Sequence, residues 1–296
     1  MSSICVIGAG KWGSALHFAL SQKQQCFISN RTNKDIDNFI SIKDALNCDY
    51  LIIAIPSQFI REWLDNNFIF KGQKVLVAAK GIEASSGAFL QDIYEKFVPK
   101  ENLGFISGPS FATEVKQALP TALVINSSSL QFYKEFNKFF PSFIKLYYSD
   151  DIIGAEIAGA YKNVLAIASG ITKGLNLGLN AQASLISRGL VEMERFGAFY
   201  GAKKDTFLGL SGAGDLFLTA SSELSRNFRV GLGLAQNKTL DLILQELGEV
   251  AEGVMTSYAI DKLSIQNNIY TPIANEVKKI LDGKDPKLSL QDLLKS

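Results

Sequence analysis

The residue best suited to move a proton in this sequence is Lys162, which lies in a long apolar segment. Residues Ile152–Ile171 contain only two charged side chains, Glu156 and Lys162. A helix that is apolar nearly all round is buried, and the positions one turn from Lys162 carry no acid. Burial without a counter-ion favours the neutral amine, which can take a proton from an alcohol. The alternative is a lysine whose stem extends out to water.

A second group of polar residues suits a phosphate monoester. Ser225, Arg226 and Asn227 combine one cation with two neutral hydrogen-bonding side chains, and a guanidinium pairs well with phosphate oxygens. Ser225 could instead be an ordinary N-cap of a helix. Further upstream, the segment S-G-A-G-D at 211–215 suggests a backbone turn that presents the Asp215 carboxylate.

Two more polar segments directly follow apolar runs. Lys80 comes after Lys74–Ala79, and S-G-P-S-F-A at 107–112 closes a similar run. Open α/β sheets bind ligands at the carboxyl ends of their strands. Lys80 could therefore contact an anion or a hydroxyl there, and the second segment could offer backbone N–H groups and a hydroxyl. A solvated loop lysine is the alternative for Lys80.

The sequence begins with a phosphate-binding pattern, G-A-G-K-W-G at 8–13. It lies between an apolar strand and a helix, which is the context that dinucleotide binding requires. Gly8 permits the tight turn, Gly10 lets the backbone approach a pyrophosphate, and Gly13 allows the helix to pack closely on the strand. The N-terminus of the helix then supplies the anion site. A glycine-rich turn without function is the alternative.

The end of the second predicted strand indicates which dinucleotide binds. An NAD-specific fold usually has Asp or Glu there, to hold the ribose hydroxyl. Here the residues are Asn30, Arg31 and Thr32. Because an arginine at this place can pair with a 2′-phosphate, we expect NADPH to be preferred, with NADH also accepted. An ordinary surface arginine is the alternative for Arg31.

The first half of the chain alternates apolar runs with helical patterns, which predicts βαβ units around a parallel sheet. Parallel strands that are buried on both faces are continuous aliphatic runs. The predicted strands are Ser3–Ala9, Cys26–Ser29, Tyr50–Ile55, Lys74–Ala79, Leu103–Ser107, Ala122–Asn126 and Phe143–Tyr148. The predicted helices are Trp12–Gln22, Ala88–Phe97 and Leu130–Phe140.

After Asp150 the apolar periodicity is helical almost throughout. The predicted helices are Ile152–Ile171, Ala181–Phe199, Leu240–Leu247, Ser257–Gln266 and Pro272–Leu281. The sequence therefore predicts a Rossmann-like dinucleotide-binding domain over residues 1–149. An all-α substrate and catalytic domain is expected over residues 150–296. An all-α domain of this kind often offers a dimer face, so a homodimer stays open as the assembly.

Composition excludes several classes of function. Lys plus Arg is 30 and Asp plus Glu is 29 in 296 residues, so no overall basic field draws the chain to nucleic acid. No apolar run approaches the length of a membrane helix, and no secretory signal is expected. The cysteines, Cys5, Cys26 and Cys48, lack metal-ligand spacing and are interpreted as core thiols of a cytoplasmic protein. The single histidine, His17, is interpreted as a scaffold residue, and no metal site is expected.

Several of these segments together resemble the bacterial NAD(P)-dependent glycerol-3-phosphate dehydrogenase family. The matching segments occur in the family's order from residue 8 to residue 253. They are G-A-G-K-W-G at 8–13, A-K-G-I-E at 79–83, S-G-P-S-F-A at 107–112, G-A-Y-K-N-V-L-A at 159–166, G-A-G-D at 212–215, S-R-N at 225–227 and V-A-E-G at 250–253. The lysine segment and S-R-N are much more specific than the glycine pattern.

The resemblance implies interconversion of sn-glycerol 3-phosphate and dihydroxyacetone phosphate with NAD(P), which supplies the glycerol backbone of phospholipids. It implies three catalytic residues, with Lys162 as general acid and base, Lys80 shared between cofactor and substrate, and Asp215 beside the base. The implied substrate contacts are Lys80, Gly108, Ser110, Lys162, Asp215, Ser225, Arg226 and Asn227. The implied cofactor contacts are Lys11, Trp12, Arg31, Lys80, Ala112, Arg226, Val250 and Glu252, together with Gly8, Gly10 and Gly13.

The sequence departs from the family pattern in two places. Only 18 residues separate Arg31 from the strand at Tyr50, which is short for the family and bears on the adenine side of the cofactor site. Tyr161 stands where a smaller aliphatic residue is usual. Two other hypotheses remain: a hydroxy-acid dehydrogenase or ketopantoate-type reductase, and a non-catalytic NADP-sensing protein. The phosphate-suited S-R-N disfavours the former, and the joint presence of Lys162 and Asp215 disfavours the latter.

Overall fold

In the computed structural model, which describes residues 2–295, the apolar runs of the first half form one sheet of seven strands. Each predicted strand is present, with ends that differ from the prediction by at most two residues. The strands are β1 (Ile4–Ile7), β2 (Phe27–Ser29), β3 (Tyr50–Ile53), β4 (Lys74–Val77), β5 (Leu103–Ser107), β6 (Thr121–Asn126) and β7 (Ile144–Ser149).

The strand order is β2-β1-β3-β4-β5-β6-β7. The order reverses between β1 and β3, and ligands of such sheets bind beyond the carboxyl ends of the strands at this point. The prediction of a wholly parallel sheet is wrong in one pair, because β6 runs antiparallel to β5. The connection 108–120 between these two strands contains the four-residue helix α5 (Ala112–Val115).

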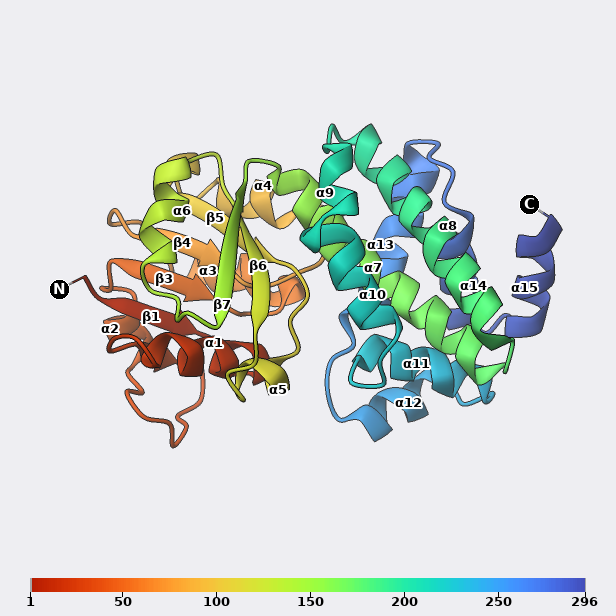
Figure 1. The fold of residues 1–296 in the computed structure, drawn as a ribbon, viewed down its shortest axis with the longest axis horizontal. Coiled ribbons are helices and arrows are strands. Elements are labelled where there is room, and N and C mark those ends of the chain that lie inside the picture. The colour runs from red at the N-terminus through yellow and green to blue at the C-terminus, as the bar shows by residue number, and fades with distance from the viewer. Residues whose placement is uncertain (1, 296) are drawn as a thin grey trace. The chain divides into compact units, whose positions relative to one another are not determined.

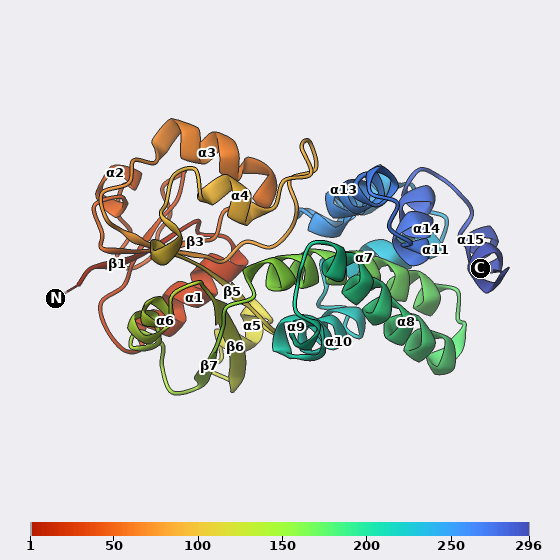
Figure 2. The same ribbon diagram turned by 90° about the horizontal axis from the view of Figure 1, so that it is seen from above.

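Helices cover both faces of this sheet (Figure 1). In Figure 2, α3 and α4 lie on one face and α1 and α6 on the other. The helices of this unit, besides α5, are α1 (Lys11–Ser21), α2 (Ile42–Ala45), α3 (Ile60–Asn67), α4 (Leu90–Tyr94) and α6 (Leu130–Asn137). Alternate strand residues such as Ile4, Val6 and Ile52 pack against Leu16 of α1 and Phe132 of α6 in one buried cluster. The period of two along each strand thus separates the two covered faces.

The second half is helical, as predicted. Its helices are α7 (Ile152–Gly174), α8 (Gly178–Phe199), α9 (Lys204–Leu208), α10 (Asp215–Ala220), α11 (Arg226–Ala235), α12 (Leu240–Leu247), α13 (Glu252–Gln266), α14 (Pro272–Leu281) and α15 (Pro286–Lys295). A π-helical turn, Leu210–Gly214, precedes α10. The short helices α9 and α10 and the helices α11 and α15 were not predicted.

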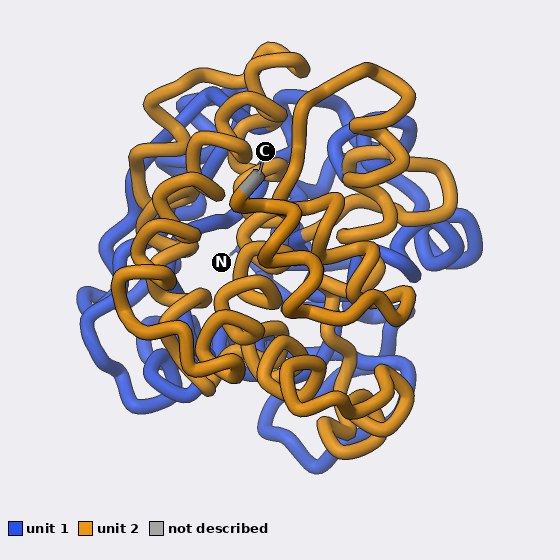
Figure 3. The backbone as a smooth tube through the Cα atoms, turned by 90° about the vertical axis from the view of Figure 1, so that its right-hand side faces the viewer, with its two compact units in different colours: residues 1–80, 90–152 blue, residues 81–89, 153–296 orange. Residues whose placement is uncertain are grey.

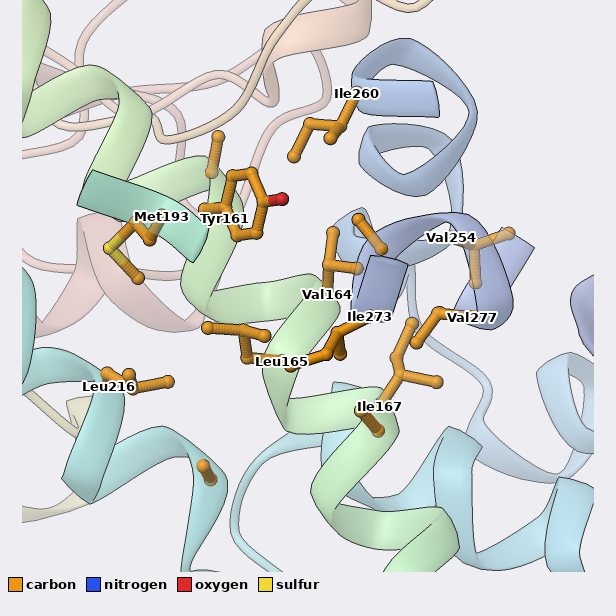
Figure 4. Close-up of a cluster of buried hydrophobic side chains, with 14 of the residues drawn as sticks. Tyr161, Val164, Leu165, Ile167, Met193, Leu216, Val254, Ile260, Ile273 and Val277 are labelled. Carbon is orange, nitrogen blue, oxygen red and sulfur yellow. The ribbon is translucent and has the colours of Figure 1, made fainter. Parts of the chain in front are cut away.

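Helix α7 forms the centre of this half. Its 23 residues are apolar on several sides, and they contribute a large share of one buried cluster. Figure 4 shows side chains of α7 pointing toward Met193 of α8, Leu216 of α10 and Ile273 of α14. The prediction that the segment around Lys162 is buried is therefore confirmed.

The chain divides into two compact units (Figure 3). The first unit comprises residues 1–80 and 90–152, and the second comprises 81–89 and 153–296. The segment 81–89 forms a small hairpin in which Ile82 pairs with Phe89. Both side chains are buried in the cluster around α7, and the Phe89 ring lies 5.0 Å from that of Tyr200. Its place in the second unit was not predicted.

The histidine and the cysteines are part of the scaffold of the first unit. His17 of α1 is buried, and its Nε2 lies 3.0 Å from the carbonyl oxygen of Cys26. The three cysteines are buried free thiols. Within residues 2–295, no cluster of three or more His, Cys, Asp or Glu side chains could hold a metal ion. None of the described helices has the length and apolar character needed to cross a membrane.

Candidate active site

The glycine-rich turn at the end of β1 has the geometry of a phosphate site. Gly8 has φ +107°, and a Cβ there would lie 2.6 Å from the carbonyl oxygen of Ala54. A Cβ on Gly13 would lie 1.8 Å from the oxygen of Gly8, so only glycine allows α1 to pack this closely on the turn. At Gly10, the N-cap of α1, no atom lies within 4 Å of a Cβ position, and no side chain caps the helix. The backbone at the start of α1 is thus open to an anion.

The residues predicted to surround this turn are arranged along α1 and α5. Lys11 and Trp12 are the first residues of α1, Lys11 exposed and Trp12 packed partly against the core of the sheet. Ala112 is the first residue of α5. These two helices contact each other, so the structure places the three predicted cofactor residues in one region of the first unit.

At the end of β2, Asn30 contacts the glycine-rich turn directly. Its Oδ1 accepts a hydrogen bond from the backbone N–H of Ala9 at 3.2 Å. Arg31 follows and is exposed. Lys34, which the sequence analysis did not single out, donates from Nζ to the carbonyl oxygen of Ala9 at 2.7 Å. Two side chains that follow β2 therefore bind the same residue of the turn.

Lys80 and the segment after β5 come together at the carboxyl edge of the sheet, as predicted. The Lys80 Nζ donates to the carbonyl oxygen of Gly108 at 3.3 Å, and the Ser110 hydroxyl donates to the same oxygen at 3.2 Å. Lys80 and Ser110 are half-buried. Neighbouring parallel strands β4 and β5 end at this edge, which brings an ammonium and a hydroxyl to one place.

In the helical unit, Lys162 forms a buried ion pair. Its Nζ lies 2.6 Å from Asp215 Oδ1 and 2.9 Å from the hydroxyl oxygen of Thr219. The three residues are 8%, 1% and 5% exposed. The expectation, drawn from the neighbouring residues, that Lys162 is buried without a counter-ion is therefore wrong: the acid comes from α10, 53 residues further along the chain. Its position beside Lys162 agrees with what the family resemblance implies for Asp215. An isolated charge would be costly at this depth, and Asp215 offsets that cost.

The local structure around Asp215 also differs from the prediction. The segment S-G-A-G at 211–214 lies in the π-helical turn, and Asp215 begins α10, so the carboxylate is presented by a helix and not by a backbone turn. Asp215 and Thr219 are four residues apart on α10, which puts both side chains on one face. Thr219 was missed, and its spacing from Asp215 is the signal that could have indicated it.

The other end of α10 is bound to the neighbouring helices. The Ser169 hydroxyl of α7 donates to the carbonyl oxygen of Ala220 at 2.6 Å. The Gln182 amide of α8 donates to the same oxygen at 3.3 Å and to the Ser169 hydroxyl at 2.9 Å. Buried hydrogen bonds of this kind fix α10 against α7, and so they fix Asp215 relative to Lys162.

The segment Ser225–Asn227 forms the start of α11. Ser225 is its N-cap, and its oxygen accepts from the N–H of Phe228 at 3.3 Å, so the ordinary capping interpretation of this hydroxyl is confirmed. Arg226 is the first helical residue, and its guanidinium lies 3.4 Å from Glu249 Oε2. The Arg226 side chain is 42% exposed, so this ion pair is a weak, solvent-screened one.

Asn227 connects α11 with the start of α13. Its Oδ1 accepts from the backbone N–H of Gly253 at 3.0 Å, which caps a helix that has no side-chain cap of its own. This contact brings the predicted residues Val250 and Glu252 to the same region as Arg226. Val250 is exposed and Glu252 is the first residue of α13. Asn227, which is expected to contact substrate, thus also stabilises the start of α13.

Tyr161, the unusual neighbour of Lys162, belongs to a buried polar group. Its hydroxyl donates to Glu192 Oε1 of α8 at 2.8 Å. The Glu192 oxygens also accept from the backbone N–H groups of Ile273 and Ala274 at 2.8 and 2.9 Å, so the carboxylate caps α14. Burial raises the pKa of Glu192 above its ordinary value, and burial also raises the pKa of Tyr161. Three helices are linked at this carboxylate.

We expect Glu192→Gln to lower the free energy of unfolding by about 2 kcal/mol. The amide replaces one acceptor with a donor, which leaves a buried backbone N–H of α14 without a partner, at a cost of about 1–3 kcal/mol. Chemical denaturation at neutral pH measures the change, and Glu194→Gln on the same helix is the matched control. Equal stability of the two variants would contradict this role of Glu192.

A dinucleotide-binding sheet joined to a helical unit that holds a buried lysine–aspartate pair defines a two-domain dehydrogenase. Family models described as the N-terminus and the C-terminus of NAD-dependent glycerol-3-phosphate dehydrogenase match residues 28–133 and 151–291. The chain belongs to the NAD-dependent glycerol-3-phosphate dehydrogenase family.

Close relatives extend over the whole chain. A glycerol-3-phosphate dehydrogenase [NAD(P)+] of Sulfurimonas denitrificans is 61% identical over 294 residues, 99% of each chain. One of Campylobacter jejuni subsp. doylei is 63% identical over 292 residues, 99% of this chain and 98% of the relative. Among solved structures, glycerol-3-phosphate dehydrogenase of Coxiella burnetii matches with a TM-score of 0.91 and 31% identity, covering 100% of this chain and 99% of the other.

Proposed function

We propose that this protein interconverts sn-glycerol 3-phosphate and dihydroxyacetone phosphate by hydride transfer with NAD(P). The observation that carries the proposal is the buried pair of Lys162 and Asp215, 2.6 Å apart, in a chain that belongs to a dehydrogenase family. The reaction would supply glycerol 3-phosphate for phospholipid synthesis.

Lys162 is the proposed general acid and base. The bound nicotinamide cofactor supplies or accepts the hydride at C2 of the substrate. In the reductive direction, the Lys162 ammonium gives a proton to the carbonyl oxygen as the hydride arrives at the carbon. In the oxidative direction, the neutral amine takes the hydroxyl proton as the hydride leaves. Proton transfer by a positioned side chain contributes about 10²–10⁴-fold to such rates.

Asp215 and Thr219 support this proton transfer without exchanging protons with the substrate. The Asp215 carboxylate stabilises the ammonium that the reductive reaction consumes. Thr219 accepts a hydrogen bond from Lys162 Nζ at 2.9 Å, which restricts where the amine can point. Asp215 and Thr219, on one helix face, therefore orient the ammonium, and a substrate oxygen is the proposed partner in proton transfer.

The proposed phosphate contacts are at the start of α11. Arg226 pairs with the phosphate oxygens, and exchanging the half-buried Glu249 for a phosphate strengthens its charge-assisted bonds. Ser225 uses its oxygen as a helix cap but can still donate its hydroxyl hydrogen. Asn227 uses its oxygen on Gly253, and its amide hydrogens are the proposed donors to the substrate. Lys80, Gly108 and Ser110 are the proposed substrate contacts of the first unit, with Lys80 also serving the cofactor.

For the cofactor, we propose NADPH as the preferred form and NADH as an accepted one. The open backbone at Gly10 and the start of α1 suit the pyrophosphate. The absence of an acid at the end of β2, where Asn30 precedes Arg31, supports a 2′-phosphate over a free ribose hydroxyl. The remaining proposed cofactor contacts are Lys11, Trp12, Ala112, Arg226, Val250 and Glu252.

The competing hypotheses have less support. Substrates of hydroxy-acid dehydrogenases and ketopantoate-type reductases carry carboxylates and no phosphate, which leaves the S-R-N segment unexplained. A non-catalytic NADP sensor would have no use for a buried acid–base pair that costs desolvation energy. We also propose a cytoplasmic location, supported by the three free thiols, and a homodimer as the assembly.

The test is NADPH oxidation by the purified protein with dihydroxyacetone phosphate, run in parallel with NADH and with unphosphorylated dihydroxyacetone. We expect fast turnover that requires the phosphate group of the substrate. At the same low cofactor concentration, turnover with NADPH should be faster than turnover with NADH. A folded protein that binds NADPH but oxidises neither cofactor would contradict the proposed reaction. Equal rates with both phosphorylated and unphosphorylated substrate would contradict the phosphate site.

A further inference from the structure

The residue Ala9, at the centre of the glycine-rich turn, is bound on both sides by residues that follow β2. Its N–H donates to Asn30 Oδ1 at 3.2 Å, and its carbonyl oxygen accepts from Lys34 Nζ at 2.7 Å. Ala9 is buried at 3% exposure, whereas Lys34 is exposed. An ammonium group therefore lies directly at the turn that approaches a dinucleotide.

The segment that carries Lys34 is anchored at both ends. After Asn30 it leaves β2, and at 38–40 it returns alongside this strand. The N–H of Ile40 donates to the oxygen of Ile28 at 2.9 Å, and the Ser29 hydroxyl donates to the oxygen of Ile40 at 2.8 Å. Residues 31–37 thus form a short loop beyond the end of β2, and Lys34 reaches from this loop to the turn.

The region between the glycine-rich turn and the end of β2 has a known role in dinucleotide-binding folds. The end of the second strand and the first turn hold the adenosine ribose, and a carboxylate there binds the 2′-hydroxyl. Here that position is the neutral Asn30, and its oxygen is used on Ala9. The loop contributes two cations, Arg31 and Lys34, and two acids, Asp35 and Asp37. Of these four side chains, Lys34 is the one that binds the turn, through the carbonyl oxygen of Ala9. A dianionic 2′-phosphate is the ribose substituent that such cations recognise.

The present partner of Lys34 is also one that a phosphate would replace. A neutral carbonyl is a weaker acceptor for an ammonium than a phosphate oxygen. Because Lys34 is exposed and has a flexible stem, a small rotation transfers its ammonium from Ala9 to a group bound beside the turn. Arg31 is the first residue of the loop and would provide one cation for the phosphate. Lys34, in the middle of the loop, would provide the second.

We propose that Lys34 is the second cation of a 2′-phosphate subsite, acting with Arg31 to favour NADPH over NADH. This inference rests on the proposed preference for NADPH. The alternative is that Lys34 only fixes the glycine-rich turn. The two differ in a measurable way, because a fixed turn serves both cofactors equally and a phosphate contact serves NADPH alone.

The experiment compares kcat/KM for NADPH and for NADH in the wild type, Lys34→Met, Lys34→Arg, Arg31→Asp and Lys23→Met. Lys23 is the matched control, because it is also an exposed lysine that donates to a backbone carbonyl, that of Phe140 at 3.1 Å. For Lys34→Met we expect kcat/KM for NADPH to fall about tenfold, with a much smaller change for NADH. Lys34→Arg should keep most of the preference, and Lys23→Met should keep it all.

Inhibition gives a second readout that does not depend on hydride transfer. Adenosine 2′,5′-bisphosphate should inhibit Lys34→Met more weakly than the wild type, while inhibition by adenosine 5′-monophosphate stays similar. An equal loss for both cofactors or for both inhibitors overturns the proposal in favour of a structural role. If the ratio of kcat/KM for NADPH to kcat/KM for NADH changes in Arg31→Asp and stays constant in Lys34→Met, the proposed role of Lys34 is overturned and that of Arg31 stands. A constant ratio in both variants overturns the NADPH preference itself and the subsite with it.

Discussion

Lys162→Ala is expected to lower kcat by about a thousandfold or more, while NADPH still binds. The variant removes the only side chain proposed to exchange a proton with the substrate oxygen, and general acid–base catalysis contributes about 10²–10⁴-fold. The methyl group of alanine cannot stabilise the oxyanion that then develops. Steady-state turnover with dihydroxyacetone phosphate and a fluorescence titration with NADPH measure the two quantities separately. Turnover close to that of the wild type would remove Lys162 from the acid–base role.

The control for this variant has to separate catalysis from folding. Removing one partner of a buried ion pair destabilises a protein by about 3–5 kcal/mol, and here the buried Asp215 carboxylate would lose its contact with the Lys162 ammonium. The double variant Lys162→Ala, Asp215→Asn removes both charges and should recover part of this stability without recovering kcat. Lys173→Ala, at the exposed end of the same helix, should leave both kcat and stability unchanged.

Arg226→Ala is expected to raise KM for dihydroxyacetone phosphate by about a hundredfold. A charge-assisted hydrogen bond contributes up to about 3 kcal/mol, and about 1.4 kcal/mol corresponds to a tenfold change. Because the ion pair of Arg226 with Glu249 is partly exposed, losing it should cost little stability. An unchanged KM would mean that the phosphate binds elsewhere.

Two comparisons show whether the effect of Arg226 acts through the phosphate. For unphosphorylated dihydroxyacetone, kcat/KM should change far less in Arg226→Ala than it does for the phosphorylated substrate. Arg188→Ala removes an exposed arginine from α8 and should leave KM for dihydroxyacetone phosphate as in the wild type. Equal losses for both substrates in Arg226→Ala would indicate a contribution to the cofactor or to the fold.

The fold could be predicted largely because the buried strands of the first half are continuous aliphatic runs and α7 is apolar nearly all round. Local patterns of this kind do not indicate the order of the strands in the sheet or their relative directions. Nothing in Thr121–Asn126 indicates that β6 runs antiparallel to β5. The short helices α9 and α10 were missed for a related reason, since five or six residues give too little periodicity to detect.

In the candidate site, residue types were easier to predict than their partners. Lys162 stands out as a charge in an apolar segment, and this property is local. Its contact with Asp215 depends on how α10 packs against α7, through atoms such as the Ala220 carbonyl oxygen that Ser169 binds. The same limit explains why Lys34 was overlooked. Its importance lies in one bond to Ala9, and in the sequence it is an ordinary surface lysine.

The hairpin at 81–89 has a consequence for the order of events during synthesis. Its Ile82 and Phe89 belong to the core around α7, yet they leave the ribosome well before any residue of that helix. Since domains fold from the N-terminus as they emerge, the sheet can close while these two side chains still lack their partners. The nascent chain must therefore hold an apolar loop in water until α7 and α8 have been made. In this interval the apolar side chains of the hairpin are open to chaperones and to aggregation.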